Sequence, residues 1–70
     1  MGRLLLDKTE VNLSETPEPV QQAIKELTRN ARLGSITRTL EGQEVTYDIV
    51  LKMGDKWETK TLGRDGKLVP

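Results

Sequence analysis

Residues 45–53 alternate between apolar and polar side chains, and this pattern constrains the fold more than any other in the chain. Successive side chains of a β-strand point to opposite faces of a sheet, so the alternation predicts a strand with one buried face. Its apolar members are Val45, Tyr47, Ile49, Leu51 and Met53. Glycine-containing segments at 41–43, 54–55 and 63–66 predict turns on both sides of this strand and after residues 56–62. Three strands of an antiparallel meander, closed by a short last strand at 68–69, are therefore expected.

A helix is predicted directly before the meander. One apolar helix face is formed at three- and four-residue spacing by Val20, Ala23, Ile24, Leu27 and Ala31. Thr16 is expected to cap the helix, with Pro17 at the first helical position, where an N–H group has no partner within the helix. Gly34 is expected to end the helix in the left-handed conformation. The result would be one amphipathic helix of about four turns.

The segment before the helix predicts a short strand. Val11 and Leu13 alternate with polar neighbours, as in a half-buried strand. Residues 1–9 form either an N-terminal extension or linker, or a further short strand, and residues 10–70 form the domain proper. The fold class is therefore α+β: a single helix packed on one face of an antiparallel β-meander sheet, with a short N-terminal strand. The other face of the sheet is left open.

The composition argues against several classes of function. The chain has 70 residues, with no Cys and no His, so the usual nucleophiles, general bases and metal ligands are scarce. Eleven Lys and Arg balance eleven Asp and Glu, whereas nucleic-acid binding usually shows as a basic excess. No apolar run approaches the ~18 residues of a membrane span. We expect no catalytic residues, no cofactor, no metal site, no nucleic acid and no membrane insertion.

The position of Trp57 depends on the length of one turn. Trp57 and Leu62 are five residues apart, so a regular strand places them on opposite faces. A two-residue turn at 54–55 puts Trp57 opposite Lys52 on the open face, whereas a three-residue loop puts it opposite Leu51 on the core face. The sequence leaves both arrangements open. In the first, a candidate protein-binding patch is formed by Trp57, Val50, Lys52 and Thr59.

Three segments together resemble a known family. They are V-N-L-S-E-T-P at 11–17, V-Q-Q-A-I at 20–24 and D-G-K-L-V at 65–69. With the tyrosine-bearing strand, they resemble the PepSY-like domains of bacterial secreted and envelope proteins, over roughly residues 10–70. The chain departs from the family pattern at Glu58 and Lys60, where an aromatic or aliphatic residue is expected.

The resemblance implies a helix-on-sheet fold and a periplasmic or secreted location. Residues 1–7 lack the apolar region and cleavage site of a signal peptide. Related PepSY domains occur in propeptides of metalloproteases and are thought to restrain peptidase activity. No catalytic residues come with the family.

Two functions follow as expectations. The first is a non-catalytic protein-interaction module that binds a protein or peptide through the open sheet face or a strand edge. The alternative is a structural, spacer or self-associating domain of a larger exported protein, with no ligand of its own. Lys56 and Lys60 can equally protect the sheet edge from unwanted pairing.

Overall fold

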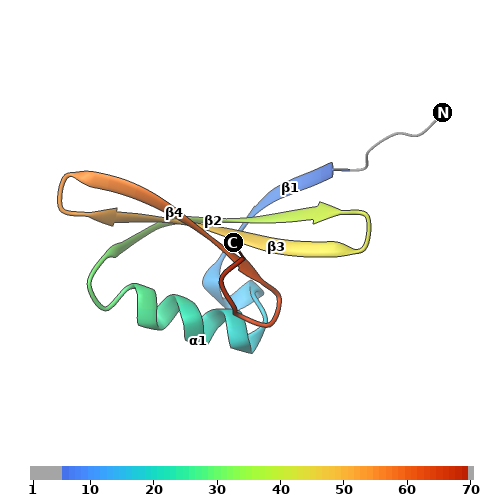
Figure 1. The fold of residues 1–70 in the computed structure, drawn as a ribbon, viewed down its shortest axis with the longest axis horizontal. Helices are drawn as coiled ribbons and strands as arrows, with labels where there is room; N and C mark the ends of the chain where they lie inside the picture. The colour runs from blue at the N-terminus through green and yellow to red at the C-terminus, as the bar shows by residue number, and fades with distance from the viewer. Residues whose placement is uncertain (1–5, 70) are drawn as a thin grey trace.

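A computed structural model describes residues 6–69 of the chain and shows one α-helix and four strands (Figure 1). The strands form one antiparallel sheet in the order β1-β2-β3-β4. Their bounds are β1 Leu6–Val11, β2 Arg32–Glu41, β3 Glu44–Met53 and β4 Lys56–Gly63. A 3-10 helix, η1 (Leu13–Glu15), and the helix α1 (Glu18–Leu27) connect β1 to β2. The predicted α+β class, with one helix on a meander sheet and a short N-terminal strand, is confirmed.

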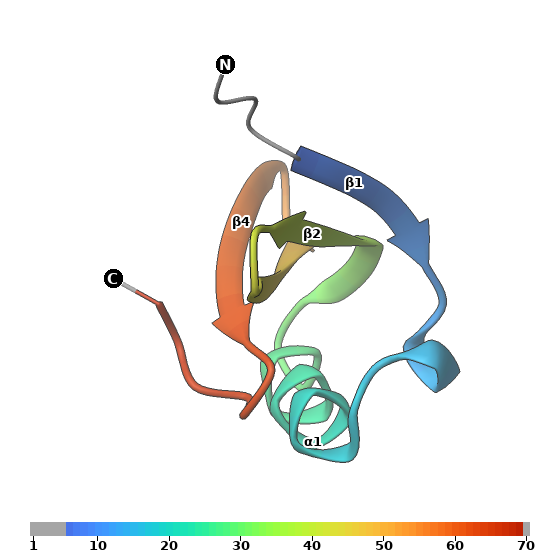
Figure 2. The same cartoon turned by 90° about the vertical axis from the view of Figure 1, so that its right-hand side faces the viewer.

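The core lies between α1 and one face of the sheet (Figure 2). Three alternate residues of β3 are buried, as the sequence pattern predicts. The buried apolar set is Val11, Val20, Ile24, Ile36, Tyr47, Ile49, Leu51 and Leu62. Burying each such side chain stabilises the fold by about 1.5–3 kcal/mol. Both hairpin tips project beyond α1 in Figure 1, so the helix covers only the middle of this face.

The start of α1 differs from the prediction. The helix begins at Glu18, and Pro17 is its N-cap residue. The Thr16 hydroxyl donates a hydrogen bond to the Leu13 carbonyl at 2.7 Å, so Thr16 closes η1 and does not cap α1. The sequence reasoning missed η1, whose three residues take up this local hydrogen bonding before the helix begins.

The end of α1 also differs from the prediction, because the helix stops at Leu27 after ten residues, or about three turns. The backbone N–H and the hydroxyl of Thr28 both donate to the Ile24 carbonyl at 2.9 Å, so Thr28 closes the last turn. Gly34 lies inside β2 and does not have positive φ. The predicted left-handed cap at Gly34 is therefore wrong.

Strand β1 lies earlier than the sequence indicates. Residues 6–9 belong to it, and Leu13 instead opens η1. Asp7 pairs with Leu40 and Val11 pairs with Ile36, so the polar run 7–10 runs along the sheet edge. Of residues 7–11, only Val11 reaches the core, and residues 7–10 are exposed. An edge strand with one buried residue has little apolar pattern to recognise. Of the three leucines at 4–6, Leu4 and Leu5 lie outside the described residues.

Both hairpins have two-residue loops, since Glu41 pairs with Glu44 and Met53 pairs with Lys56. The first loop residue is a glycine in each case, with φ of 61° and 63°, and the second has negative φ, as in a type II′ turn. The register of β3 and β4 continues without a bulge from this turn. The two-residue arrangement at 54–55 is thus the correct one.

The C-terminal tail, residues 64–69, folds back over the end of β4. Leu62 forms a single bridge with Leu68, and the Val69 N–H donates to the Thr61 carbonyl at 2.8 Å. Gly66 has φ of 83°, and a Cβ there would overlap the carbonyl group of Pro19 at the start of α1. This close contact of two backbones holds the tail against the helix, and only glycine leaves room for it.

Replacing Gly66 by alanine is expected to destabilise the domain more than the same change at Gly42. Both positions have positive φ, but a Cβ at Gly42 meets nothing within 4 Å. Gly42→Ala should therefore lower the free energy of unfolding by about 1–2 kcal/mol, which is the cost of positive φ for a residue with a Cβ. Gly66→Ala should lose about 3 kcal/mol or more, because a backbone clash is added. Urea unfolding followed by circular dichroism gives both values, and equal losses would contradict the tail contact.

Candidate interaction surface

The four residues of the candidate patch form two neighbouring cross-strand pairs on the sheet face opposite α1, here called the outer face. Trp57 of β4 pairs with Lys52 of β3, and Thr59 pairs with Val50. Trp57 is 61% exposed, Lys52 and Thr59 are exposed, and Val50 is half-buried. These residues, Trp57, Val50, Lys52 and Thr59, are called the Trp57 surface below.

The indole of Trp57 reaches across β3 and lies over Gly34 on β2. A Cβ at Gly34 would be 2.9 Å from Cζ3 of Trp57, 3.2 Å from the carbonyl oxygen of Val50 and 3.5 Å from Cγ1 of Val50. Gly34 sits at an irregularity in the register between Leu33 and Ser35. The bare backbone therefore provides the space for the ring. Sequence reasoning missed this role, although a glycine inside a strand is a recognised sign of close approach.

Lys52 adds a second contact to the ring. Its Nζ lies 5.6 Å from the centroid of the Trp57 ring, within the range of a cation–π interaction. At an exposed site such a contact contributes about 0.5–1 kcal/mol. Trp57 is thus held in place by Gly34 below and Lys52 beside it, even though most of its surface faces solvent.

The rest of the outer face, where it is formed by β2, β3 and β4, is polar. The alternation of the strands places five threonines on it, which are Thr37, Thr39, Thr46, Thr59 and Thr61. The Thr61 hydroxyl donates to Oδ1 of Asp48 at 2.7 Å, across the two strands. Within β2, β3 and β4, the large apolar side chains on this face are therefore concentrated at one end, around Trp57 and Val50.

The edge of β4 beside the Trp57 surface is only partly covered. The C-terminal tail pairs with Thr61 and Gly63 through two backbone hydrogen bonds. Within residues 6–69, no comparable hydrogen bond reaches the outward edge at Trp57 or Thr59. The opposite edge of the sheet is β1, whose exposed side chains include Asp7, Lys8 and Glu10.

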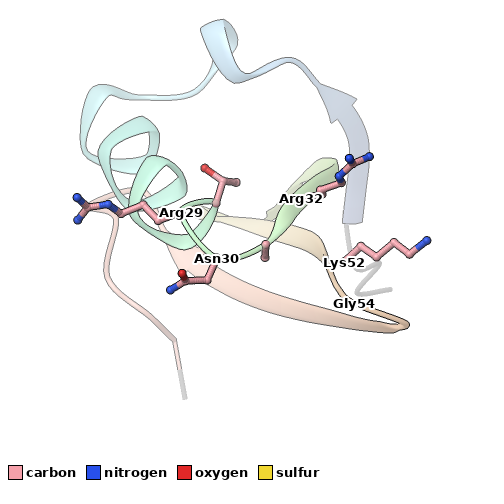
Figure 3. A pocket seen from close by; sticks show the side chains of 7 residues that line it. Arg29, Asn30, Arg32, Lys52 and Gly54 are labelled. Carbon is pink, nitrogen blue, oxygen red and sulfur yellow. The ribbon is translucent and has the colours of Figure 1, made fainter.

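A shallow hollow of about 480 Å³ lies between the end of α1 and the β3–β4 hairpin (Figure 3). Three basic residues, Arg29, Arg32 and Lys52, line it. In Figure 3 the side chain of Arg29 extends away from those of Arg32 and Lys52, which point to the same side as each other, and Arg29 pairs with Glu26 at 3.3 Å. Because Arg29 points away and is paired with Glu26, the three basic side chains do not converge on one point.

Among residues 6–69, no group of three or more His, Cys, Asp or Glu side chains is placed to hold a metal ion. No helix in the same range has the length and apolar character needed to cross a membrane.

Comparison of the chain with models of protein families, with curated proteins and with solved structures gave no match in any of the three.

Replacing Gly34 by alanine is expected to displace the indole and leave the fold nearly unchanged. The atom that a Cβ would meet first, Cζ3 of Trp57, is at the end of a movable side chain. The second atom it would meet, the Val50 carbonyl oxygen at 3.2 Å, must shift by a few tenths of an ångström. The free energy of unfolding should therefore fall by about 1 kcal/mol, offset in part because alanine restricts the unfolded chain. The acrylamide quenching constant of Trp57 should rise.

Ser35→Ala is the matched control, because Ser35 neighbours Gly34 on β2 and pairs with Val50. Its Cβ is already present, so the variant adds no atom beside the ring. Quenching that stays at the wild-type level in Gly34→Ala would show that the ring does not rest on Gly34.

Proposed function

We propose that this chain is a non-catalytic protein-interaction module of PepSY-like type, which binds a protein or peptide through the Trp57 surface. The observation that carries the proposal is an exposed tryptophan that is held against Gly34 on the open face. The resemblance of segments 11–17, 20–24 and 65–69 to PepSY-like domains supports the same reading. It also supports a location outside the cytoplasm.

An ordered, exposed tryptophan is well suited to anchor a partner. Tryptophan is enriched among the residues that dominate binding energy at protein interfaces. Ordering a side chain on binding lowers affinity by about 0.5–1.5 kcal/mol. Gly34 and Lys52 already restrict the Trp57 ring in the free protein. Much of the cost of ordering this side chain is therefore not added when a partner binds. Val50 beside the ring extends the apolar contact.

A dilution series distinguishes a free binding surface from a self-associating structural domain. If the proposal holds, the emission of Trp57 should be red-shifted and quenched by acrylamide at every protein concentration. Sedimentation velocity over the same series should give a monomer throughout. Protection of Trp57 that increases with concentration would instead favour the structural, self-associating alternative.

Peptide selection tests binding directly. Random heptapeptides displayed on phage are selected on the immobilised domain. The dissociation constants of the enriched peptides are then measured for the wild-type protein and for variants. Trp57→Ala and Val50→Asp should each weaken binding at least tenfold, which corresponds to ~1.4 kcal/mol. Thr46→Ala, at the far end of the same outer face, should have no effect. Enriched peptides that bind all three variants equally would rule out the Trp57 surface.

A further inference from the structure

The open part of the β4 edge presents a defined set of unpaired backbone groups. In an antiparallel strand, the N–H and C=O groups of alternate residues point to the same side. Thr61 and Gly63 point outward, since both bond to the C-terminal tail. By the same alternation, Trp57 and Thr59 point outward too, and no described residue pairs with them there. These two residues offer two donors and two acceptors to an added strand.

The side chains along this edge have an alternating charge pattern. Lys56, Glu58 and Lys60 share one face of β4, and Nζ of Lys60 lies 3.3 Å from Oε1 of Glu58. All three side chains are accessible at this edge. Trp57 and Thr59 occupy the other face. An incoming strand would therefore meet a basic–acidic–basic row on one side and an aromatic ring on the other.

This pattern disfavours a second copy of the chain as the added strand. The two-fold antiparallel register that uses all four backbone groups places Trp57 of each copy opposite Thr59 of the other. The same register places Glu58 opposite its own equivalent, and Lys56 opposite Lys60. Like charges directly opposite each other destabilise a strand pair. The pattern fits a different chain, with the charges reversed.

We infer that the partner of the Trp57 surface contributes an extended segment that pairs antiparallel with β4 at residues 56–59. The segment lies on the same edge of β4 as the C-terminal tail and runs in the same direction as the tail. The segment carries a basic residue opposite Glu58, an acidic residue opposite Lys56, and apolar β-branched residues opposite Trp57 and Thr59. Cross-strand pairs of opposite charge and aromatic–aliphatic pairs are both favourable. This inference rests on the proposed function and specifies its mode of binding.

The probe is the capped peptide Val-Arg-Val-Glu-Thr, which ends before the place of Val69 opposite Thr61, titrated into ¹⁵N-labelled protein and followed by NMR. Its two valines lie opposite Thr59 and Trp57, and its arginine lies opposite Glu58. Saturable shifts are expected at the amides of Trp57 and Thr59. The peptide Val-Glu-Val-Arg-Thr has the same composition with the charges exchanged, and should bind about tenfold more weakly. The double variant Lys56→Glu with Glu58→Lys should reverse this preference.

N-methylation of the peptide distinguishes backbone pairing with β4 from binding through side-chain contacts on the outer face alone. A methyl group on the nitrogen of either valine removes a hydrogen bond to β4 and should abolish binding. A methyl group on the nitrogen of the arginine, which points away from β4, should be tolerated. Equal binding of the N-methylated peptides, equal binding of the charge-exchanged peptide, or no binding of the probe at 5 mM would overturn the inference.

The proposed function is tested separately by the phage-selected peptides. If those peptides require Trp57 but tolerate N-methylation at every position, the surface binds partners by its face alone. The function would then stand, and only the strand-pairing mode would be wrong.

Discussion

The structure depends on the packing of one apolar row of β3 against α1. Tyr47, Ile49 and Leu51 are almost fully buried, and Val20 and Ile24 of the helix cover them. Because side chains alternate along a strand, burying this row sends its neighbours to the other face. A shift of one residue would bury Lys52 and Asp48, both of which carry charges, so the register has no close competitor. The packing of the core therefore determines which side chains of β3 lie on the outer face.

The two-residue turn at Gly54 transmits this register to β4. With Met53 paired to Lys56, every later pair of the two strands is determined, including Tyr47 with Leu62 and Lys52 with Trp57. Leu62 then enters the core, and Trp57 cannot. The turn geometry thus places a large aromatic residue on the solvent side. The absence of a side chain at Gly34 of β2 leaves space for its ring.

The sequence predicted the elements that bury a regular apolar pattern. The alternation of β3, the helical spacing of Val20 and Ile24, and both glycine turns led to the observed α+β meander. It did not predict features decided by local hydrogen bonding or by contacts between distant residues. Thr16 closes η1 and not α1, and Gly34 serves the indole and not a helix end. The two cross-strand pairs of the Trp57 surface followed from one of two possible turn lengths, and only the structure decided between them.

Trp57 is the only tryptophan of the chain, and its position outside the core has a consequence for how the molecule can be observed. In many small domains the tryptophan is buried, so its emission reports unfolding. Here the emission originates from the surface and from the contacts with Gly34 and Lys52. It will change when the outer face is covered or when β2 moves under the ring, while the core can lose its packing with a smaller optical signal. The chain thus carries an intrinsic fluorophore that is sensitive to occupancy of its surface more than to the integrity of its fold.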